Sequence, residues 1–248
     1  MTDRVLTAAH RARAVLGGAE EAPLDDVLEL VERGHGVPVG VLALGPELAG
    51  AYLRRPRGAL ILLNGRDAAA RLRFTLAHEL GHHVLAHDQR VDTEATLYRS
   101  SRPVEVQANA FAAELLAPVG AVRAWLASRG APAVGLDEVV ALAAEFGVSA
   151  PAALFRLVAA GGVSRERERR LRSELEEHAH LDLRHRLGLP TFEDGLSRAR
   201  ERMPRVPPGS ALDAYARGEL GAERLAAIVR AALDDVLATM RSVDLDLV

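Results

Sequence analysis

The spacing of apolar residues along the chain predicts many helices and few strands. Apolar residues that recur every three to four positions predict amphipathic helices, and they do so in residues 3–16, 24–34, 68–87, 103–117, 119–129, 137–146 and 150–160. Short runs rich in valine, leucine and isoleucine predict strands at residues 37–42, 50–54 and 59–63. The combination indicates a mainly helical α+β fold with a small β-sheet.

The pattern of the chain changes after residue 164. Residues 165–186 alternate arginine with glutamate, which is typical of a solvated helix with surface ion pairs. Prolines and a glycine at 204–209 indicate a loop, and helical patterns return at 211–216 and 219–240. We therefore divide the chain into three units, which are residues 1–131, 132–163 and 164–248. The last unit is a helical C-terminal region of unassigned role.

Composition narrows the class of protein. A chain of 248 residues can bury a full core and form one or two domains. It has no cysteine, which excludes disulfides and cysteine-ligated metal sites. No apolar run reaches transmembrane length and the first residues lack a signal-peptide pattern, so we expect a cytoplasmic protein without membrane contact. The net charge of −3 argues against non-specific binding of nucleic acid.

The strongest chemical signal is the pattern His-Glu-x-x-His inside the predicted helix at 68–87. His78 and His82 are four residues apart, so they share one helix face and can offer two imidazoles to one metal ion. Glu79 lies beside them, where it can take a proton from a water molecule. Apolar neighbours such as Leu76 and Leu80 indicate that the helix is buried, and buried ionisable groups need partners. The pattern predicts a catalytic metal site.

A catalytic zinc site has three protein ligands and a water molecule, so a third ligand is needed. Glu105 is our first choice because it lies in the next buried helix, with Asn109 one turn later on the same face. We expect Asn109 to hydrogen-bond a ligand histidine and to fix its tautomer. The alternative for Glu105 is an ordinary acidic residue in the first helical turn. Rival third ligands remain open at four positions: His87, Asp88, Asp92 and Glu94.

Three further residues are candidates for contacts with an oxyanion or with substrate: His83, His87 and Tyr98. On a continuing helix His83 is about 100° from the ligand face. We therefore expect His83 and His87 to line or cap the site rather than to bind its metal. Zinc, one ion per chain, fits the ligand types best, while manganese or iron stays an alternative.

Two stretches of the chain resemble the ImmA/IrrE family of metallopeptidases. They are Arg73 to His87 (RFTLAHELGHHVLAH) and Glu105 to Pro118 (EVQANAFAAELLAP). Residues 50–55 and 59–64 match the two strands that precede the active-site helix in that family. The resemblance is close over residues 10–118, and a looser match continues to about residue 160.

The resemblance implies a zincin-like, zinc-dependent endopeptidase. Carried over by position, His78, His82 and Glu105 are its metal ligands and Glu79 is its catalytic acid and base. It also implies a protein partner, since members of the family cleave helix-turn-helix (XRE-type) repressors or antitoxins and so release stress, phage or mobile-element genes.

Residues 132–163 resemble a helix-turn-helix unit. Two short helices at 137–146 and 150–160 are joined by Gly147-Val148-Ser149. Recognition of DNA needs basic and amide side chains, and the second helix offers one arginine with no asparagine, glutamine or lysine. We therefore favour packing or protein recognition over DNA binding.

Two other functions stay open. One is a regulatory DNA- or protein-binding protein with a structural or vestigial zinc site, which would normally be closed by a fourth protein ligand. The other is a general peptidase or a chaperone-like zincin with no repressor partner.

Overall fold

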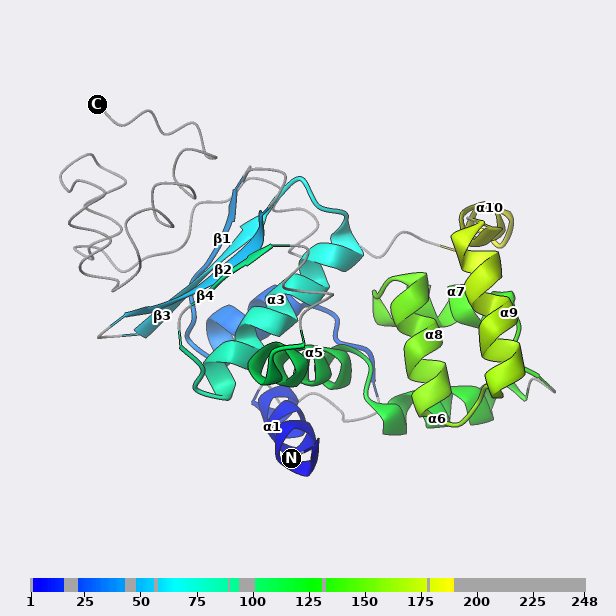
Figure 1. Cartoon of the computed structure of the whole chain (residues 1–248), viewed down its shortest axis with the longest axis horizontal. Helices are drawn as coiled ribbons and strands as arrows, with labels where there is room; N and C mark the ends of the chain where they lie inside the picture. Colours follow the sequence, from blue (N-terminus) through cyan, green and yellow to red (C-terminus); the bar gives the residue numbers. More distant parts are fainter. Residues whose placement is uncertain are drawn as a thin grey trace.

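The mainly helical α+β architecture is confirmed in the computed structural model (Figure 1). The structure describes residues 2–15, 22–42, 48–55, 58–88, 90–93, 101–130, 133–177 and 179–189. The helices predicted at 211–216 and 219–240 lie outside the described residues, and so does the loop at 204–209.

A mixed sheet of four strands forms one layer of the molecule. The strands are β1 (Val39–Leu42), β2 (Leu48–Arg55), β3 (Gly58–Asn64) and β4 (Arg90–Thr93). Their order is β1-β3-β2-β4, with β1 parallel to β3 and the other two pairs antiparallel. β3 is buried on both faces, from Ala59 to Asn64, which explains its continuous apolar sequence.

Strand β4 is not among the three strands that the apolar pattern predicts, because residues 88–102 are largely polar. Val91 pairs with Ala51 and Arg90 pairs with Tyr52, so β4 extends the sheet beyond β2. An edge strand is held by backbone hydrogen bonds to one neighbour. Its polar sequence therefore carried no strand signal that the apolar pattern could detect.

Helix α3 (Ala69–Val84) lies against the sheet and contacts β2 and β3. Helix α5 (Pro103–Leu116) crosses α3, and α1 (Thr2–Ala14) packs on α5 from the other side (Figure 1). The three helices enclose a core with leucines such as Leu76 and Leu115. α3 is thus covered by the sheet and by α5, and this position explains its burial.

The helix predicted at 24–34 is shorter and less regular than expected. Asp26 accepts hydrogen bonds from the backbone amides of Leu28 and Glu29, so α2 (Val27–Glu29) begins after Asp26, three residues later than predicted. The chain continues as a π-helical turn, η1 (Leu30–Gly34).

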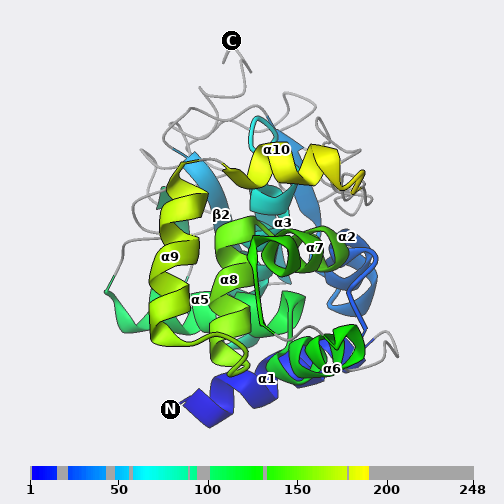
Figure 2. The ribbon, with the colours of Figure 1, turned by 90° about the vertical axis from the view of Figure 1, so that its right-hand side faces the viewer.

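Five further helices form a unit beside the sheet domain: α6 (Val119–Arg129), α7 (Leu136–Phe146), α8 (Ala150–Ala159), α9 (Arg165–Glu176) and α10 (Ala179–Arg186). Figure 2 looks onto this unit, with α8 and α9 side by side. The prediction of one helix over 165–186 is wrong, because α9 ends at Glu176 and α10 begins at Ala179. Charged residues continue on both sides of this break, so the sequence pattern does not reveal it. The break lets α10 change direction and pack on α7.

α7 and α8 meet at an angle of 105°. Gly147 ends α7 with a positive φ of 63°, a conformation that costs glycine little. Ser149 begins α8 by accepting a hydrogen bond from the amide of Ala152. The angle lies in the range of about 90–120° that helix-turn-helix pairs adopt; what the pair binds stays a prediction.

The prediction that no apolar run is long enough to cross a membrane is wrong for one stretch. Pro103–Arg129 passes a test of length and composition, with 56% of its apolar window buried inside the molecule. Its first part is α5, which packs between α1 and α3. Core helices pass the same test, so the apolar character of α5 is accounted for by its place in the core.

Candidate metal centre

Helix α3 carries an unusual number of buried polar side chains. His78, Glu79 and His82 are each 0% exposed. The apolar residues Leu72, Leu76 and Leu80 form the stripe that faces the core. Because the helix is covered nearly all round, its polar face points into protein rather than water, where each ionisable group requires a compensating partner.

The side chains of His78, His82 and Glu105 converge on one point between α3 and α5. The Nε2 atoms of the two histidines are 2.9 Å apart. Each lies 3.3 Å from Oε2 of Glu105. Tetrahedral zinc with bonds of about 2.0–2.1 Å separates its ligand atoms by about 3.3–3.4 Å, so the triangle has nearly the size that such an ion requires.

Asn109 sets the tautomer of His78. Its side-chain oxygen lies 2.9 Å from Nδ1 of His78. An amide oxygen can only accept, so Nδ1 of His78 carries the proton and donates it. The neutral ring then has its lone pair on Nε2, which is the atom that faces Glu105.

A longer chain of hydrogen bonds sets the tautomer of His82. Nε2 of His87 donates to the side-chain oxygen of Gln107 at 3.1 Å, which leaves Nδ1 of His87 as an acceptor. Nδ1 of His82 then donates to it across 2.9 Å. His82 therefore also has its Nε2 lone pair facing the site. Sequence reasoning missed Gln107, although it lies two residues from both Glu105 and Asn109.

The end of α3 explains how His87 reaches this position. The amide of His87 bonds the carbonyl of His82 at 2.9 Å, and the amide of Ala86 bonds that of His83 at 3.1 Å. This is the Schellman pattern of a helix end. It requires a positive φ at Ala86, observed at 58°, which costs a residue other than glycine about 1–2 kcal/mol. The turn folds His87 back onto the ring of His82.

The donor set fits a divalent cation. Two nitrogen lone pairs and a carboxylate oxygen lie within 3.3 Å of one another in a site shielded from water. Such groups repel one another strongly where little water screens them. A cation at their centre turns this repulsion into attraction. Imidazole and carboxylate ligands suit zinc, and also iron or manganese.

Glu79 lies on the side of α3 that faces strand β2. A Cβ atom added to Gly50 of β2 would lie 3.0 Å from Oε1 of Glu79 and 2.7 Å from Cγ2 of Thr75. Any larger residue at position 50 would therefore collide with the α3 side chains. Gly50 lets the strand pass this close to the Glu79 carboxylate.

Gly81 brings α3 and α5 together at the level of the metal ligands. A Cβ atom at this position would lie 3.0 Å from Cδ1 of Phe111 and 3.3 Å from Cα of Ala108. Two ligands are on α3 and the third is on α5, so the distance between these helices sets the size of the ligand triangle.

His83 points to the sheet side of α3. Its Nδ1 shares a 3.3 Å hydrogen bond with the hydroxyl of Tyr52 on β2, and the rings meet edge to face. Burial, followed by the nearby charges of His35 and Arg54, lowers the pKa of His83, while burial raises the pKa of Tyr52.

None of the other candidate residues joins the ligand triangle in the part of the chain that the structure describes. His87 lies behind His82, as described above. Asp88 is exposed, and among the described residues the group of possible ligands contains only His78, His82 and Glu105. The backbone of Asp92 lies in β4, and Glu94 and Tyr98 lie outside the described residues.

Sequence reasoning also missed Arg73, which is fully buried. Its Nε donates to the carbonyl of Gly147 at 3.1 Å, and its Nη2 donates to that of Leu24 at 2.9 Å. One turn before His78, this arginine attaches the active-site helix to the turn between α7 and α8. No local sequence pattern indicates this role, because the burial of Arg73 depends on the fold.

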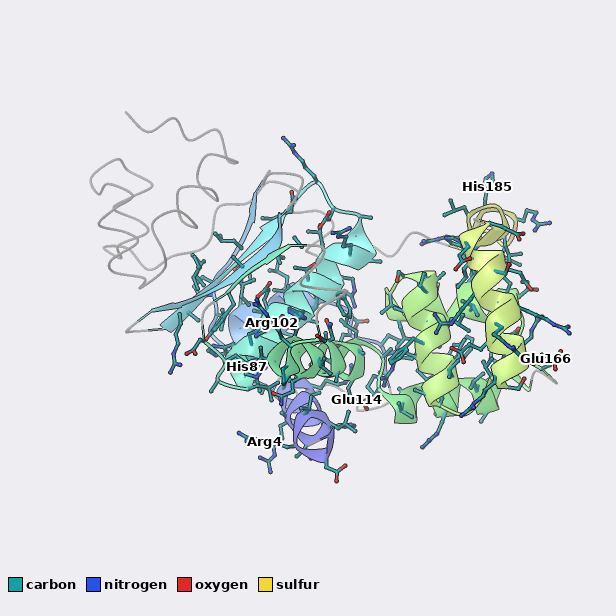
Figure 3. All side chains as sticks on the ribbon, viewed as in Figure 1. Arg4, His87, Arg102, Glu114, Glu166 and His185 are labelled. Atoms are coloured by element: carbon teal, nitrogen blue, oxygen red, sulfur yellow. The ribbon has the colours of Figure 1, made fainter. Side chains whose placement is uncertain are left out.

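A second buried polar cluster joins α1, α5 and α8. The carboxylate of Glu114 pairs with the guanidinium of Arg156 and lies 3.1 Å from Nε2 of His10. Nε of Arg156 donates to the carbonyl of Ala117 at 2.6 Å. Figure 3 shows Glu114 at one end of α5, with His87 and Arg102 at the other. The only basic side chain of α8 is thus engaged inside the protein.

Comparison with known proteins agrees with this geometry. The search of curated proteins finds no match. The model of one family, described as the IrrE N-terminal-like domain (Peptidase_M78), matches residues 33–158, about half of the chain, and this range includes the ligand triangle. The chain therefore belongs to the Peptidase_M78 family of metallopeptidases, as its buried His-His-Glu site also indicates.

Proposed function

We propose that this metallopeptidase is a zinc-dependent endopeptidase that cleaves a helix-turn-helix repressor or antitoxin in the cytoplasm and so relieves repression. The observation that carries the proposal is the convergence of His78, His82 and Glu105, with Glu79 beside them on α3. In this reading the three converging side chains hold the metal. Asn109 and His87 orient the ligand rings from behind.

Each residue has a distinct part in the proposed reaction. When bound, the metal supplies Lewis acidity, which polarises the scissile carbonyl and lowers the pKa of water. The Glu79 carboxylate accepts the proton of the attacking water and passes it to the leaving amine. Because Glu79 is fully buried against β2, its carboxylate is held in place and shielded from bulk water.

The packing of α8 supports recognition of protein over DNA. Its single arginine, Arg156, is buried in the ion pair with Glu114, so its charge is not on the surface where phosphates would lie. Gly147, in the turn before α8, is bound by Arg73 of the active-site helix. This contact attaches the α7–α8 pair to the active-site helix, which supports a role for the pair in presenting a partner to the peptidase site. The alternative is a regulatory binding protein with a structural metal.

The Glu79→Gln variant tests the catalytic assignment. Loss of a general acid-base typically lowers the rate by about 10²–10⁴-fold, and the three metal ligands are untouched. We expect bound metal, measured by elemental analysis, to stay equal to that of the parent. Cleavage at the parental rate would remove Glu79 from the mechanism.

The same variant can identify the substrate. Metal-loaded Glu79→Gln protein would be used to capture partners from the extract of its own cells, with mass spectrometry and nucleic-acid analysis of what is retained. We expect a helix-turn-helix protein that the parent chain then cuts. Enrichment of a defined DNA site, with no captured protein that the parent cuts, would favour the regulatory alternative.

A further inference from the structure

A buried hydroxyl lies on α3 one helical turn before Glu79. Thr75 is 0% exposed, and within the part of the chain that the structure describes its hydroxyl has no hydrogen-bond partner. An unpaired polar group in a protein interior costs free energy, whereas an apolar group of the same shape does not. Valine has nearly that shape, so packing alone gives no reason for a hydroxyl at this position.

Thr75 and Glu79 share the side of α3 that faces strand β2. They are four residues apart and are therefore neighbours on the helix surface. A Cβ atom added to Gly50 of β2 would lie 2.7 Å from Cγ2 of Thr75 and 3.0 Å from Oε1 of Glu79. The methyl group and the carboxylate oxygen thus meet the strand at one point, which places the Thr75 side chain beside the carboxylate.

A single side-chain rotation turns the hydroxyl towards this carboxylate. The methyl and hydroxyl groups of threonine branch from the same carbon, and one of the staggered rotamers puts the hydroxyl where the methyl group of Thr75 lies here. From that position it can donate to Glu79, whose ionised carboxylate only accepts hydrogen bonds. A hydrogen bond to an ionised acceptor is stronger than one between neutral groups, which favours this rotamer once the carboxylate is charged.

Proton transfer requires such control of the Glu79 carboxylate. The last torsion of a glutamate side chain is broad and nearly two-fold, so the carboxylate plane is not set by the helix. A donor on one oxygen fixes this plane and directs the other oxygen. In a reaction centre, a misplacement of about 1 Å can lower the rate by about 10²-fold.

We propose that Thr75 is a positioning residue for Glu79: in the working enzyme its hydroxyl donates to one carboxylate oxygen and leaves the other to accept the proton of the attacking water. The proposal rests on the proposed peptidase function. Gly50 belongs to the same arrangement, because its lack of a side chain leaves the space in which Thr75 and Glu79 meet.

Two substitutions separate the hydroxyl from the rest of the Thr75 side chain. Thr75→Val removes the hydroxyl and keeps the shape, whereas Thr75→Ser keeps the hydroxyl and removes the methyl group that packs against β2. If Thr75 were only structural, activity would follow stability in both variants. A positioning role predicts crossed results, in which activity follows the hydroxyl and stability follows the methyl group.

The first measurement is urea unfolding of the metal-free proteins. We expect the midpoint of Thr75→Val at or above that of the parent, because the hydroxyl it loses has no partner in the described part of the chain. The midpoint of Thr75→Ser should be lower, because loss of a buried methyl group leaves a cavity. A midpoint for Thr75→Val clearly below that of the parent would reveal a structural partner and overturn the proposal.

The second measurement is cleavage of a quenched fluorogenic peptide by the metal-loaded proteins, with metal content checked by elemental analysis. For Thr75→Val we expect kcat to fall by about 10–100-fold. KM should stay near the parental value, because the lost interaction acts in the transition state. Thr75→Ser should keep a kcat close to that of the parent. Equal kcat for the parent and Thr75→Val would overturn the role of Thr75 and leave the peptidase function standing.

A binding measurement covers the case in which the parent cuts no peptide, which would count against the proposed function. Acetohydroxamate chelates divalent metals and gives a proton to a neighbouring acceptor, so its affinity for the metal-loaded protein depends on how Glu79 is held. We expect Thr75→Val to bind it about tenfold more weakly than the parent, as for loss of an outer hydrogen-bond partner. Thr75→Ser should bind it like the parent. Equal affinities of the parent and Thr75→Val would overturn the positioning role.

Discussion

Two buried glutamates on one helix show how the surroundings of a residue decide its role. Glu105 and Glu114 both lie on α5, nine residues apart, and are 1% and 4% exposed. Glu114 faces the guanidinium of Arg156 and the ring of His10. Glu105 faces the Nε2 atoms of His78 and His82, both of which have lone pairs directed at it.

The difference lies in the charge that each carboxylate meets. At Glu114 the protein provides its own cation, so the cluster is complete and links α1, α5 and α8. At Glu105 the protein provides further electron pairs, and the set is completed by a metal ion. A buried histidine and glutamate in contact are thus insufficient evidence of a metal site; the tautomers and the neighbouring cations distinguish the two cases.

The largest expected effect is loss of metal from Glu105→Ala. Removal of an outer hydrogen-bond partner typically weakens metal binding by about 10–100-fold, and removal of a direct ligand should weaken it further. Metal content after dialysis, measured by elemental analysis, checks this. Occupancy equal to that of the parent chain would place the third ligand elsewhere.

Glu114→Ala should give the opposite result, with full metal occupancy and lower stability. The variant leaves the buried Arg156 cation without its carboxylate, and such losses cost about 3–5 kcal/mol. The free energy of unfolding in urea measures the cost. Glu166→Ala is the matched control, since the Arg170–Glu166 pair is about two-thirds exposed and such pairs contribute about 0–1 kcal/mol. A similar small cost at both sites would refute the structural role of Glu114.

Gln107→Leu tests the chain of hydrogen bonds behind His82. Without the amide oxygen, Nε2 of His87 no longer has its acceptor, and the tautomer of His82 is no longer fixed. We expect metal affinity to fall by about 10–100-fold while the free energy of unfolding of the metal-free protein changes little. Competition with a chelator measures the affinity, and an unchanged value would show that His87 alone orients His82.

The smallest expected effect concerns His35, which lies in neither cluster. Burial lowers its pKa below the ordinary value of 6.5, and this outweighs the opposing effect of the hydrogen bond to the carbonyl of Ala12. The neutral ring is favoured in the folded state, so its contribution to stability is fully present above pH 6.5. It is lost as the pH falls towards the folded pKa, because the unfolded chain gains the proton first.

The measurement is urea unfolding of the metal-free protein between pH 7.5 and 5, where His35→Gln should show a shallower decline in stability than the parent chain. Parallel curves would mean that burial of His35 has no effect on stability across this range.

Much of the active-site helix could be predicted because its information is local. The spacing of His78 and His82 places both side chains on one helix face, with Glu79 beside them. Helical periodicity depends only on separation in the sequence, so this could be predicted. The same argument placed Asn109 one turn after Glu105. Strands β2 and β3 were predicted because their apolar runs reflect burial in the sheet.

Other features depended on contacts between distant residues. The polar sequence of β4 conceals a strand that forms by pairing with β2. The positions of His87 and Gln107 depend on the turn after α3 and on how α5 crosses it. The single arginine of α8 was read as too little basic charge for DNA recognition, and only the packing of α5 against α8 shows that it is engaged by Glu114.

By itself, the sequence determined which residues can bind a metal and which helix presents two of them, because residue type and helical spacing are local properties. The tertiary structure decided that Glu105 meets two nitrogen lone pairs while Glu114 meets a guanidinium. It also brought α8 together with α3 and α5 as walls of one apolar groove. The physical reason is that charge balance and cavities arise between elements far apart in the chain, and no local pattern specifies which side chains will meet.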